Sequence, residues 1–311
     1  MSRIRLVHVL SENWTLTPPR DLRALVRMAQ EAEDAGFDAV MVSEHVVLGP
    51  GADAGGLMPN PRDYALPGNQ DPAMPWPSSL VLLSAIAGAT TRLRLAASAI
   101  IAPLRHPLLL AKDLATLDLL SEGRLVVHPT VSWYEPEYAA LGVPFAARGA
   151  LLDEHLAAWQ AAWGPSPASF AGDHYRFGDV WVEPKPFRAD GVRLWFGSST
   201  LHGRLLRRLV HYGHGWNPLG RPSDDDVARL RSALAEAGRD PGDLELVGGT
   251  RGRFPDGHSV ADLDEALATI PEQVERGFTS ICIKPSQFLD DPSDHHAWCR
   301  EVVAKVAALT D

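Results

Sequence analysis

His45 is the residue of this sequence best suited to proton chemistry, because of the place where it stands. It follows Ser43 and Glu44 at the end of Asp38–Ser43, an apolar run typical of a buried strand. A histidine donates or accepts a proton near neutral pH, and a neighbouring carboxylate can fix its tautomer. We therefore expect His45 to be catalytic and Glu44 to orient it. The alternative is a histidine that only packs at the rim of the sheet.

A second group, Gly197, Ser198 and Ser199, has the composition of an anion site. These residues end the apolar run Val192–Phe196 and open a segment of helical period, Leu201–Tyr212. Backbone N–H groups at a helix N-terminus, beside serine hydroxyls and a glycine without a side chain, suit a phosphate. The alternative is ordinary capping of the helix by a serine, and these residues alone leave both open.

Other chemistry has less support. The sequence contains no GxGxxG after an early strand, no GxxxxGK[ST], no HExxH and no cysteine pair with metal-ligand spacing. His295 and His296 lie in a polar stretch that opens the last helix, and we expect no metal there. Glu135 and Glu137 could serve as general acid or base, but we expect both to be solvated charges.

The elements that would position these residues alternate regularly. Short apolar runs, typical of strands, are each followed by a longer segment of helical period, which is the pattern of βα units around a parallel sheet. The expected strands are Ile4–Leu10, Asp38–Ser43, Leu93–Ile101, Leu125–Val131, Val192–Phe196, Gly213–Asn217, Leu244–Gly248 and Ser280–Lys284. The expected helices are residues 20–36, Ser78–Thr90, Pro107–Leu120, Arg148–Trp163, Leu201–Tyr212, Asp224–Gly238, Val260–Gly277 and His295–Leu309. Eight such units predict one α/β domain over residues 1–311, a (β/α)8 TIM barrel whose active site lies where the strands end.

Two segments interrupt the alternation. Leu48–Pro77, after the second strand, is rich in glycine, proline and asparagine, and it is too long for an ordinary connection. We expect it to be a functional loop. Ser166–Arg188 alternates between apolar and polar residues and carries glycine and proline punctuation, which predicts a small hairpin inserted between βα units.

The composition excludes several classes of protein. The 311 residues include 29 Lys plus Arg against 39 Asp plus Glu, a net charge of −10, which argues against a nucleic-acid partner. Hydrophobic residues make up 45% of the chain, enough for a sizeable core, yet no run approaches the roughly 18 apolar residues of a membrane span. Cys282 and Cys299 show no pairing pattern, so we expect free thiols in a cytoplasmic protein.

Four stretches of this sequence resemble the luciferase-like monooxygenase superfamily of flavin- and deazaflavin-dependent oxidoreductases. The most specific is RHPLLLAKDLATLDLLSEGR, from Arg105 to Arg124. The others are SEHV at residues 43–46, FAGDHYRFGDVWVEPKPF with VRLWFGSS within residues 170–199, and GHGWNP at residues 213–218. The family has a (β/α)8 fold with an insertion and binds either F420 or reduced FMN at the C-terminal end of the barrel. The resemblance implies the same fold and a cofactor of this kind.

The resemblance also implies roles for particular residues. His45 would face the cofactor ring as a proton donor or acceptor. The third strand would carry a bulge, with a cis peptide bond between Ser98 and Ala99 that backs the ring. Gly197, Ser198 and Ser199 would bind the cofactor phosphate.

The turn after the fourth strand departs from the family pattern. Where the family has G-x-G-x-G-W, this chain has His128, Thr130 and Ser132 in place of the three glycines. Thr130 and Ser132 either supply hydroxyl contacts to the cofactor or narrow its pocket. Trp133 stands where F420-dependent sugar-phosphate dehydrogenases have a catalytic glutamate, which argues against sugar phosphates as substrates.

Within this resemblance, the alanine- and arginine-rich composition leads us to expect an F420-dependent oxidoreductase that transfers a hydride between the deazaflavin and a small organic substrate. An FMN-dependent monooxygenase is the alternative, and a family member without cofactor, acting as a binding or structural protein, is the third possibility. The substrate pocket is expected to include Trp14, Trp76, Trp133 and Trp216. F420 would require cations near the barrel mouth, for instance Arg251 or Arg253, and a homodimer is expected only by analogy with the family.

Overall fold

The computed structural model describes residues 3–310, and its centre is a closed barrel of eight parallel strands. The strands follow one another around the barrel in the order β1-β2-β3-β4-β7-β8-β9-β10. Their bounds are β1 (Arg5–Val9), β2 (Ala39–Val42), β3 (Arg94–Ile101), β4 (Leu125–Thr130), β7 (Arg193–Gly197), β8 (Gly215–Asn217), β9 (Glu245–Gly249) and β10 (Ser280–Ile283). The expected (β/α)8 barrel is therefore confirmed.

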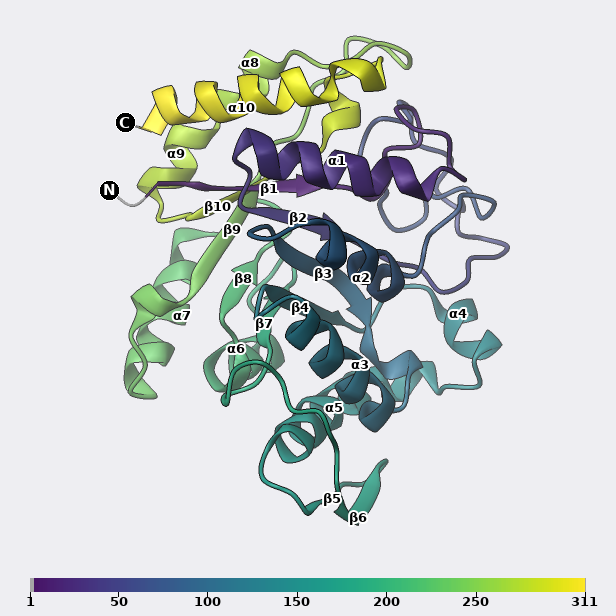
Figure 1. Cartoon of the computed structure of the whole chain (residues 1–311), viewed down its shortest axis with the longest axis vertical. Helices are drawn as coiled ribbons and strands as arrows, with labels where there is room; N and C mark the ends of the chain where they lie inside the picture. Colours follow the sequence, from purple (N-terminus) through teal and green to yellow (C-terminus); the bar gives the residue numbers. More distant parts are fainter. Residues whose placement is uncertain (1–2, 311) are drawn as a thin grey trace.

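Helices surround the barrel (Figure 1). Their bounds are α1 (Leu22–Ala35), α2 (Ser79–Ala89), α3 (Pro107–Leu120), α4 (Glu135–Ala140), α5 (Arg148–Trp163), α6 (Gly203–Tyr212), α7 (Asp224–Glu236), α8 (Leu263–Leu267), α9 (Ile270–Glu275) and α10 (His295–Thr310). Helices α1 and α10 lie side by side next to β1, so the last helix completes the ring against the first.

The pleat of each strand divides its buried side chains between two layers. In β1, Val7 and Val9 belong to a small apolar cluster inside the barrel, together with Trp195 and Cys282. Leu6 belongs instead to the much larger apolar layer between strands and helices. Successive side chains of a strand point to opposite faces, so one strand serves both layers.

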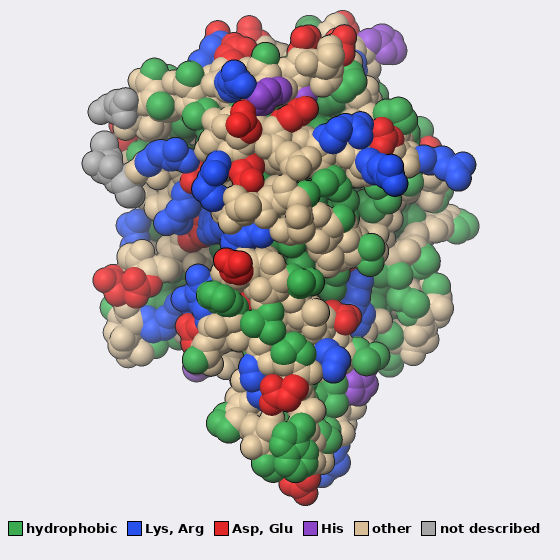
Figure 2. Space-filling model, viewed as in Figure 1, with side chains coloured by type: hydrophobic (Ala, Val, Ile, Leu, Met, Phe, Trp, Pro, Cys, Tyr) green, Lys and Arg blue, Asp and Glu red, His purple; other side chains and the backbone are tan. Residues whose placement is uncertain are grey.

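Both interruptions of the βα pattern are where the sequence places them. The expected hairpin forms β5 (Ala168–Ala171) and β6 (Arg176–Val180), an antiparallel pair that projects from the barrel (Figure 1). No helix or strand lies between β2 and α2, as expected for the long loop. On the face drawn in Figure 2, acidic and basic side chains are interspersed. No helix within residues 3–310 has the length and apolar character needed to cross a membrane.

Three helices differ from expectation. The single helix expected at Val260–Gly277 is two short helices, α8 and α9, because Pro271 in the first turn of α9 has no N–H to continue the bonding pattern. Helix α6 begins at Gly203, since the ring of His202 caps it by accepting from the backbone N–H of Leu205 at 3.2 Å. Helix α4 has no counterpart among the expected helices.

Candidate functional site

His45 lies just beyond the C-terminal end of β2 and is paired with a carboxylate from another element. Its Nδ1 lies 3.2 Å from Oε2 of Glu137, which stands in the first turn of α4. Glu137 is fully buried, and its Oε1 accepts hydrogen bonds from the backbone N–H groups of Val46 and Val47, at 2.5 and 3.2 Å. The carboxylate therefore holds both the ring and the chain around it. When the proton of the neutral ring is on Nδ1, the lone pair of Nε2 of His45 is available to a ligand.

The orienting carboxylate is thus not Glu44, which corrects our expectation. Glu44 accepts hydrogen bonds from the guanidinium of Arg105 at 2.7 and 3.0 Å. It also accepts from the backbone N–H of Ile101 and from Oγ of Ser79, both at 2.9 Å. These contacts hold the end of β2 against the end of β3 and the start of α2. Glu44 therefore positions these three elements, and Glu137 is the carboxylate that orients His45.

Sequence reasoning missed the role of Glu137. Glu135 is exposed, as expected, whereas Glu137 is not the solvated charge we expected. A six-residue helix such as α4 is too short to show helical periodicity in the sequence. The sequence feature that could have indicated this helix is Pro136 between two glutamates, because proline and carboxylates both favour the first turn of a helix.

Two tryptophans contact His45 and a third contacts one of them, and we call Trp14, Trp76 and Trp133 the aromatic cage. The His45 ring meets Trp76 and Trp133 edge to face, with centroids 5.2 and 6.1 Å apart, and Trp14 contacts Trp76 at 5.3 Å. Nε1 of Trp76 is buried without a hydrogen-bond partner among residues 3–310. A buried donor left unpaired costs about 1–3 kcal/mol, so a ligand with an acceptor gains by bonding to it. Trp216, the fourth expected residue, is fully buried in the outer apolar layer instead.

The bulge and the cis peptide bond expected at Ser98 and Ala99 are both present in β3. Oγ of Ser98 lies 2.9 Å from Nδ1 of His128 on β4. Burial lowers the pKa of His128 to about 4, so its ring is neutral at pH 7. A Cβ atom on Gly197 would lie 2.5 Å from Cε1 of His128, so the imidazole fills the space beside that glycine. Gly197 therefore makes room for the side chain of His128.

Thr130 and Ser132 lie at and just beyond the end of β4, and both are partly exposed. Ser132 has a φ of +57°, the left-handed conformation that favours glycine. The chain therefore keeps the backbone of a glycine turn with a serine in it. Oγ of Ser132 lies 3.4 Å from Oε2 of Glu137, which places a hydroxyl beside the His45–Glu137 pair.

Ser198 and Ser199 lie between β7 and α6 and do not cap the helix, so the alternative of ordinary capping by a serine is wrong. They also do not stand at the helix N-terminus, as we expected, because α6 begins at Gly203. Positive charge is nevertheless close in the chain. Arg204 and Arg208 of α6 share Asp153, at 3.3 and 2.7 Å. Arg207, on the same helix, is exposed and forms no ion pair within the described chain. Helix α6 therefore carries more positive than negative charge beside these serines.

Arg251 and Arg253, the cations expected at the mouth, are both neutralised. Arg251 donates to the carboxylate of Asp63 at 2.7 and 3.1 Å, and Arg253 donates to Glu265 at 3.0 Å. Neither supplies the positive rim that we expected for F420. The cationic surplus lies on α6 instead.

The long loop between β2 and α2 folds over the barrel mouth. Nζ of Lys284, fully buried at the end of β10, donates to the backbone oxygen of Asp63 at 2.5 Å and lies 3.6 Å from Oε2 of Glu12. The backbone N–H of Ala65 donates to the same Glu12 carboxylate at 2.7 Å. Tyr64 packs against the apolar cluster inside the barrel. Burial lowers the pKa of Lys284, and its contacts with Asp63 and Glu12 hold the loop in place.

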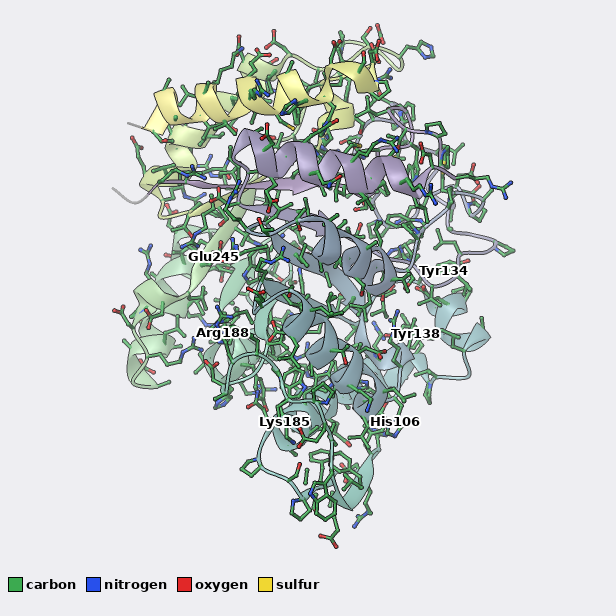
Figure 3. The ribbon with its side chains drawn as sticks, viewed as in Figure 1. His106, Tyr134, Tyr138, Lys185, Arg188 and Glu245 are labelled. Atoms are coloured by element: carbon green, nitrogen blue, oxygen red, sulfur yellow. The ribbon has the colours of Figure 1, made fainter. Side chains whose placement is uncertain are left out.

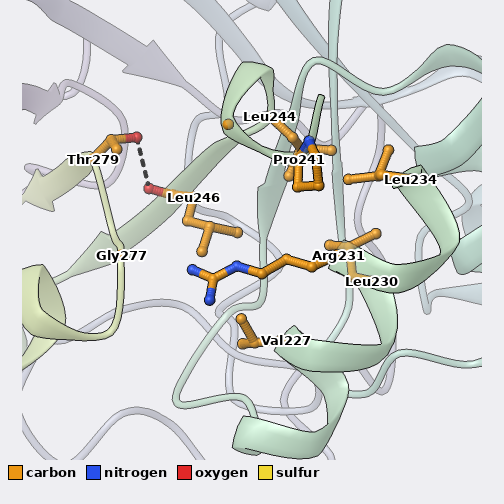
Figure 4. Close-up of a pocket in the computed structure, with 10 residues that line it drawn as sticks. Val227, Leu230, Arg231, Leu234, Pro241, Leu244, Leu246, Gly277 and Thr279 are labelled. Carbon is orange, nitrogen blue, oxygen red and sulfur yellow. Dashed lines mark hydrogen bonds between the residues drawn. The ribbon is translucent and has the colours of Figure 1, made fainter. Parts of the chain in front are cut away.

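Two cavities differ in what surrounds them. One of about 160 Å³ lies between α7 and the starts of β9 and β10, away from His45 (Figure 4). Arg231 extends along it, and Oγ1 of Thr279 donates to the backbone oxygen of Leu246 at 3.5 Å. A smaller cavity of about 30 Å³ lies beside Trp14 and Glu12. Of the expected site residues, Trp14 lines the smaller cavity, whereas His45 and Glu137 line neither of the two.

The sequence that forms this barrel matches the model of a known family over most of its length. The model of the family described as luciferase-like monooxygenase matches residues 6–267. The chain belongs to the luciferase-like monooxygenase family. It is therefore an oxidoreductase of the luciferase-like type.

Individual relatives of this luciferase-like chain differ in cofactor. An uncharacterized protein of Mycobacterium tuberculosis is 33% identical over 68% of this chain and 74% of its own length. The FMNH2-dependent dimethylsulfone monooxygenase of Pseudomonas putida is 29% identical over 67% of this chain and 53% of its own length. The coenzyme F420-dependent tetrahydromethanopterin reductase of Methanopyrus kandleri shares the fold, with a TM-score of 0.69, 14% identity and full coverage of both chains.

A flavin-type cofactor, which luciferase-like proteins imply, fits the mouth in two respects. The unpartnered Nε1 of Trp76 offers a donor next to His45. Arg207 offers a cation without a counter-charge on the helix after Ser199. Gly197 itself offers no open cradle, because His128 fills the space beside it.

Proposed function

We propose that this protein is an F420-dependent oxidoreductase that transfers a hydride between the deazaflavin and a small, partly apolar organic substrate. The observation that carries the proposal is the His45–Glu137 pair inside the aromatic cage, beyond the C-terminal end of the barrel strands. Active sites of such barrels lie at this end.

The protein's own residues would transfer the proton and exclude water from the site. Glu137 holds the Nδ1 side of His45, so that Nε2 gives or takes the proton that accompanies the hydride. The aromatic cage excludes water and packs against the apolar part of the substrate. When bound, the cofactor supplies the hydride.

The remaining expected site residues are assigned to the cofactor. Ser98 and Ala99 would lie behind its ring, and Thr130 and Ser132 would stand at its edge, where both side chains are partly exposed. The phosphate would bind at Ser198 and Ser199, with Arg207 of α6 supplying the charge. Gly197 would serve this site indirectly, by making room for His128.

An FMN-dependent monooxygenase is the second candidate, and two observations favour it. The relative from Pseudomonas putida that carries a named cofactor uses FMNH2 and is more similar in sequence than the F420-dependent structure. The neutralised Arg251 and Arg253 also leave fewer cations for the polyanionic tail of F420.

Fluorescence titration of the purified full chain with F420, and separately with FMN, tests the choice of cofactor. We expect F420 to bind at micromolar or lower concentration and FMN to bind at least 10-fold more weakly. Tighter binding of FMN would replace the first candidate by the second. Binding of neither would leave a family member without cofactor.

The role of the pair is tested by Glu137→Gln and His45→Gln, with Glu135→Gln as the matched control on the same helical turn. We expect the first two variants to lose about 10²- to 10⁴-fold in kcat, the usual contribution of a positioned acid or base. The assay follows F420 absorbance with a panel of small organic hydride donors and acceptors. Cofactor affinity should change less than about 3-fold. Equal losses in the E135Q variant would contradict the assignment.

A further inference from the structure

Three side chains able to bind a metal meet outside the barrel, and we call them the His-His-Cys cluster. His8 comes from β1, and His295 and Cys299 stand one turn apart on α10. All three are buried, and their ligand atoms lie within 4.8 Å of one another. The cluster faces the helical layer where α1 and α10 lie beside β1 (Figure 1), so the proposed reaction at the mouth does not use it.

One distance in the cluster already matches a tetrahedral zinc site, and a second would have to lengthen. Bond lengths of 2.0–2.1 Å to nitrogen and 2.3 Å to sulfur place two nitrogen ligands about 3.4 Å apart, and a nitrogen and a sulfur about 3.6 Å apart. Sγ of Cys299 lies 3.6 Å from Nε2 of His295. Nε2 of His8 lies 2.7 Å from the same nitrogen, so these two rings would have to separate by about 0.7 Å on binding.

A carboxylate fixes the orientation of one of the rings. Oε2 of Glu31 on α1 lies 2.6 Å from Nδ1 of His295. Since an ionised carboxylate only accepts, the proton of His295 sits on Nδ1 and its Nε2 lone pair points at His8 and Cys299. A carboxylate that holds the far nitrogen of a ligating histidine is the usual second layer of a zinc site.

We propose that the His-His-Cys cluster binds one Zn²⁺ ion, with His8, His295 and Cys299 as ligands and a water molecule as the fourth. This reverses the expectation from the sequence that the chain binds no metal at His295. On binding, the Cys299 thiol releases its proton to solvent, and the proton between the two imidazoles moves to Nδ1 of His8. Both histidines then remain neutral, and no electron is transferred.

Such an ion would be structural. His8 belongs to the first strand and the other two ligands to the last helix, so the ion would join the two ends of the chain where the barrel closes. The ligand set of two imidazoles and a thiolate suits zinc better than hard cations, which prefer oxygen. Without a metal, the same contacts amount to a hydrogen bond between two imidazoles with a thiol beside it.

The test is metal incorporation into the tag-free full chain during synthesis, because a buried site is slow to load afterwards. Wild type, Cys299→Ser, His8→Gln and the matched control Cys282→Ser are produced in zinc-supplemented medium and analysed for metal by mass spectrometry. Cys282 lies inside the barrel and is the only other cysteine of the chain. We expect about one equivalent of zinc in wild type and C282S, and at least a 10-fold loss in C299S and H8Q.

Production in cobalt-supplemented medium gives a second readout that a loss of stability would not imitate. Co²⁺ in the site should show tetrahedral visible bands and a thiolate charge-transfer band in wild type and C282S. H8Q provides the comparison if C299S does not fold. Metal-free wild type, cobalt spectra without the thiolate band, or equal metal content in wild type and C299S would each overturn the proposal.

Discussion

The two ends of the barrel treat their buried polar groups differently. At the start of β9, the carboxylate of Glu245 accepts from Arg94 at 2.8 and 2.9 Å and from the hydroxyl of Ser280, and it pairs with Arg5 at 3.0 Å. At the mouth, several buried polar atoms have no partner among residues 3–310. They belong to Thr15, Arg62, Gln70, Trp76 and Ser286, in the segments that follow β1, β2 and β10.

This difference separates stability from function within one barrel. Figure 3 places Glu245 at one end of the barrel and Tyr134, beside Trp133 of the aromatic cage, at the other. Within the described chain, no unpartnered buried side-chain atom belongs to a residue at the start of a barrel strand. Polar atoms that lack protein partners are the ones that a ligand can satisfy. The mouth therefore has donors and acceptors that a ligand can bind. At the opposite end, which we call the closed end, the buried carboxylate of Glu245 is paired within the protein.

The largest effect should come from the closed end. Glu245→Ala leaves the guanidinium of Arg94 without its carboxylate, and we expect the free energy of unfolding to fall by about 3 kcal/mol. Urea unfolding at pH 7 measures this change in the free energy of unfolding. Glu265→Ala, which breaks an exposed pair with Arg253, is the matched control and should change stability by less than about 0.5 kcal/mol. Similar losses in both variants would remove the distinction between buried and exposed pairs.

The pH dependence of stability gives a second measure of the closed end. The Arg94 guanidinium and the hydrogen bond from Ser280 outweigh burial and lower the pKa of Glu245 to about 2, from an ordinary value of 4.5. A carboxyl whose pKa is lowered by folding adds stability above its ordinary pKa and loses it as the pH falls. The contribution should therefore be complete above about pH 5 and decline between pH 4.5 and 2. Glu245→Gln should lack this decline, and a parallel decline in that variant would assign it to other carboxyls.

The same contrast explains how far the sequence could predict this protein. Strands, most helices and the hairpin follow from local patterns, because apolar periodicity and turn residues act over a few neighbours. Partners across elements do not: Glu44 and Glu137 are both near His45 in the structure, but only Glu137 contacts the ring, from 92 residues away in the chain. Likewise, His295 gave no metal signal because His8, its partner, lies 287 residues earlier.

A change of intermediate size is expected where the mouth is tightly packed. In Gly197→Ala, the new Cβ would lie 2.5 Å from Cε1 of His128 and 2.8 Å from the backbone oxygen of Asn217. Overpacking of this kind should destabilise the protein by about 2 kcal/mol and, because His128 must shift, weaken cofactor binding as well.

Gly88→Ala is the matched control for that substitution. Gly88 lies in helix α2, and nothing lies within 4 Å of the position of its added Cβ. Alanine there should stabilise the helix by about 0.5–1 kcal/mol, the opposite sign. Thermal unfolding of the two variants measures the contrast. A neutral G197A variant would show that His128 can move away, and that the glycine position is open to a ligand after all.

The smallest effect on stability should come from Trp76→Phe, which tests whether an unpaired polar atom at the mouth binds a ligand. The substitution removes the unpartnered Nε1–H but keeps most of the ring that contacts His45 and Trp14. Removing the unpaired donor relieves a cost of about 1–3 kcal/mol, and the smaller ring of phenylalanine loses packing of about the same size, so the net change in the free energy of unfolding should be less than about 1 kcal/mol. A ligand that accepts from this N–H would lose about 1 kcal/mol, a roughly 5-fold weaker affinity in the fluorescence titration. We therefore expect ligand affinity to fall while the free energy of unfolding stays nearly unchanged. A loss of stability without a loss of affinity would make Trp76 a packing residue, and the mouth would then resemble the closed end.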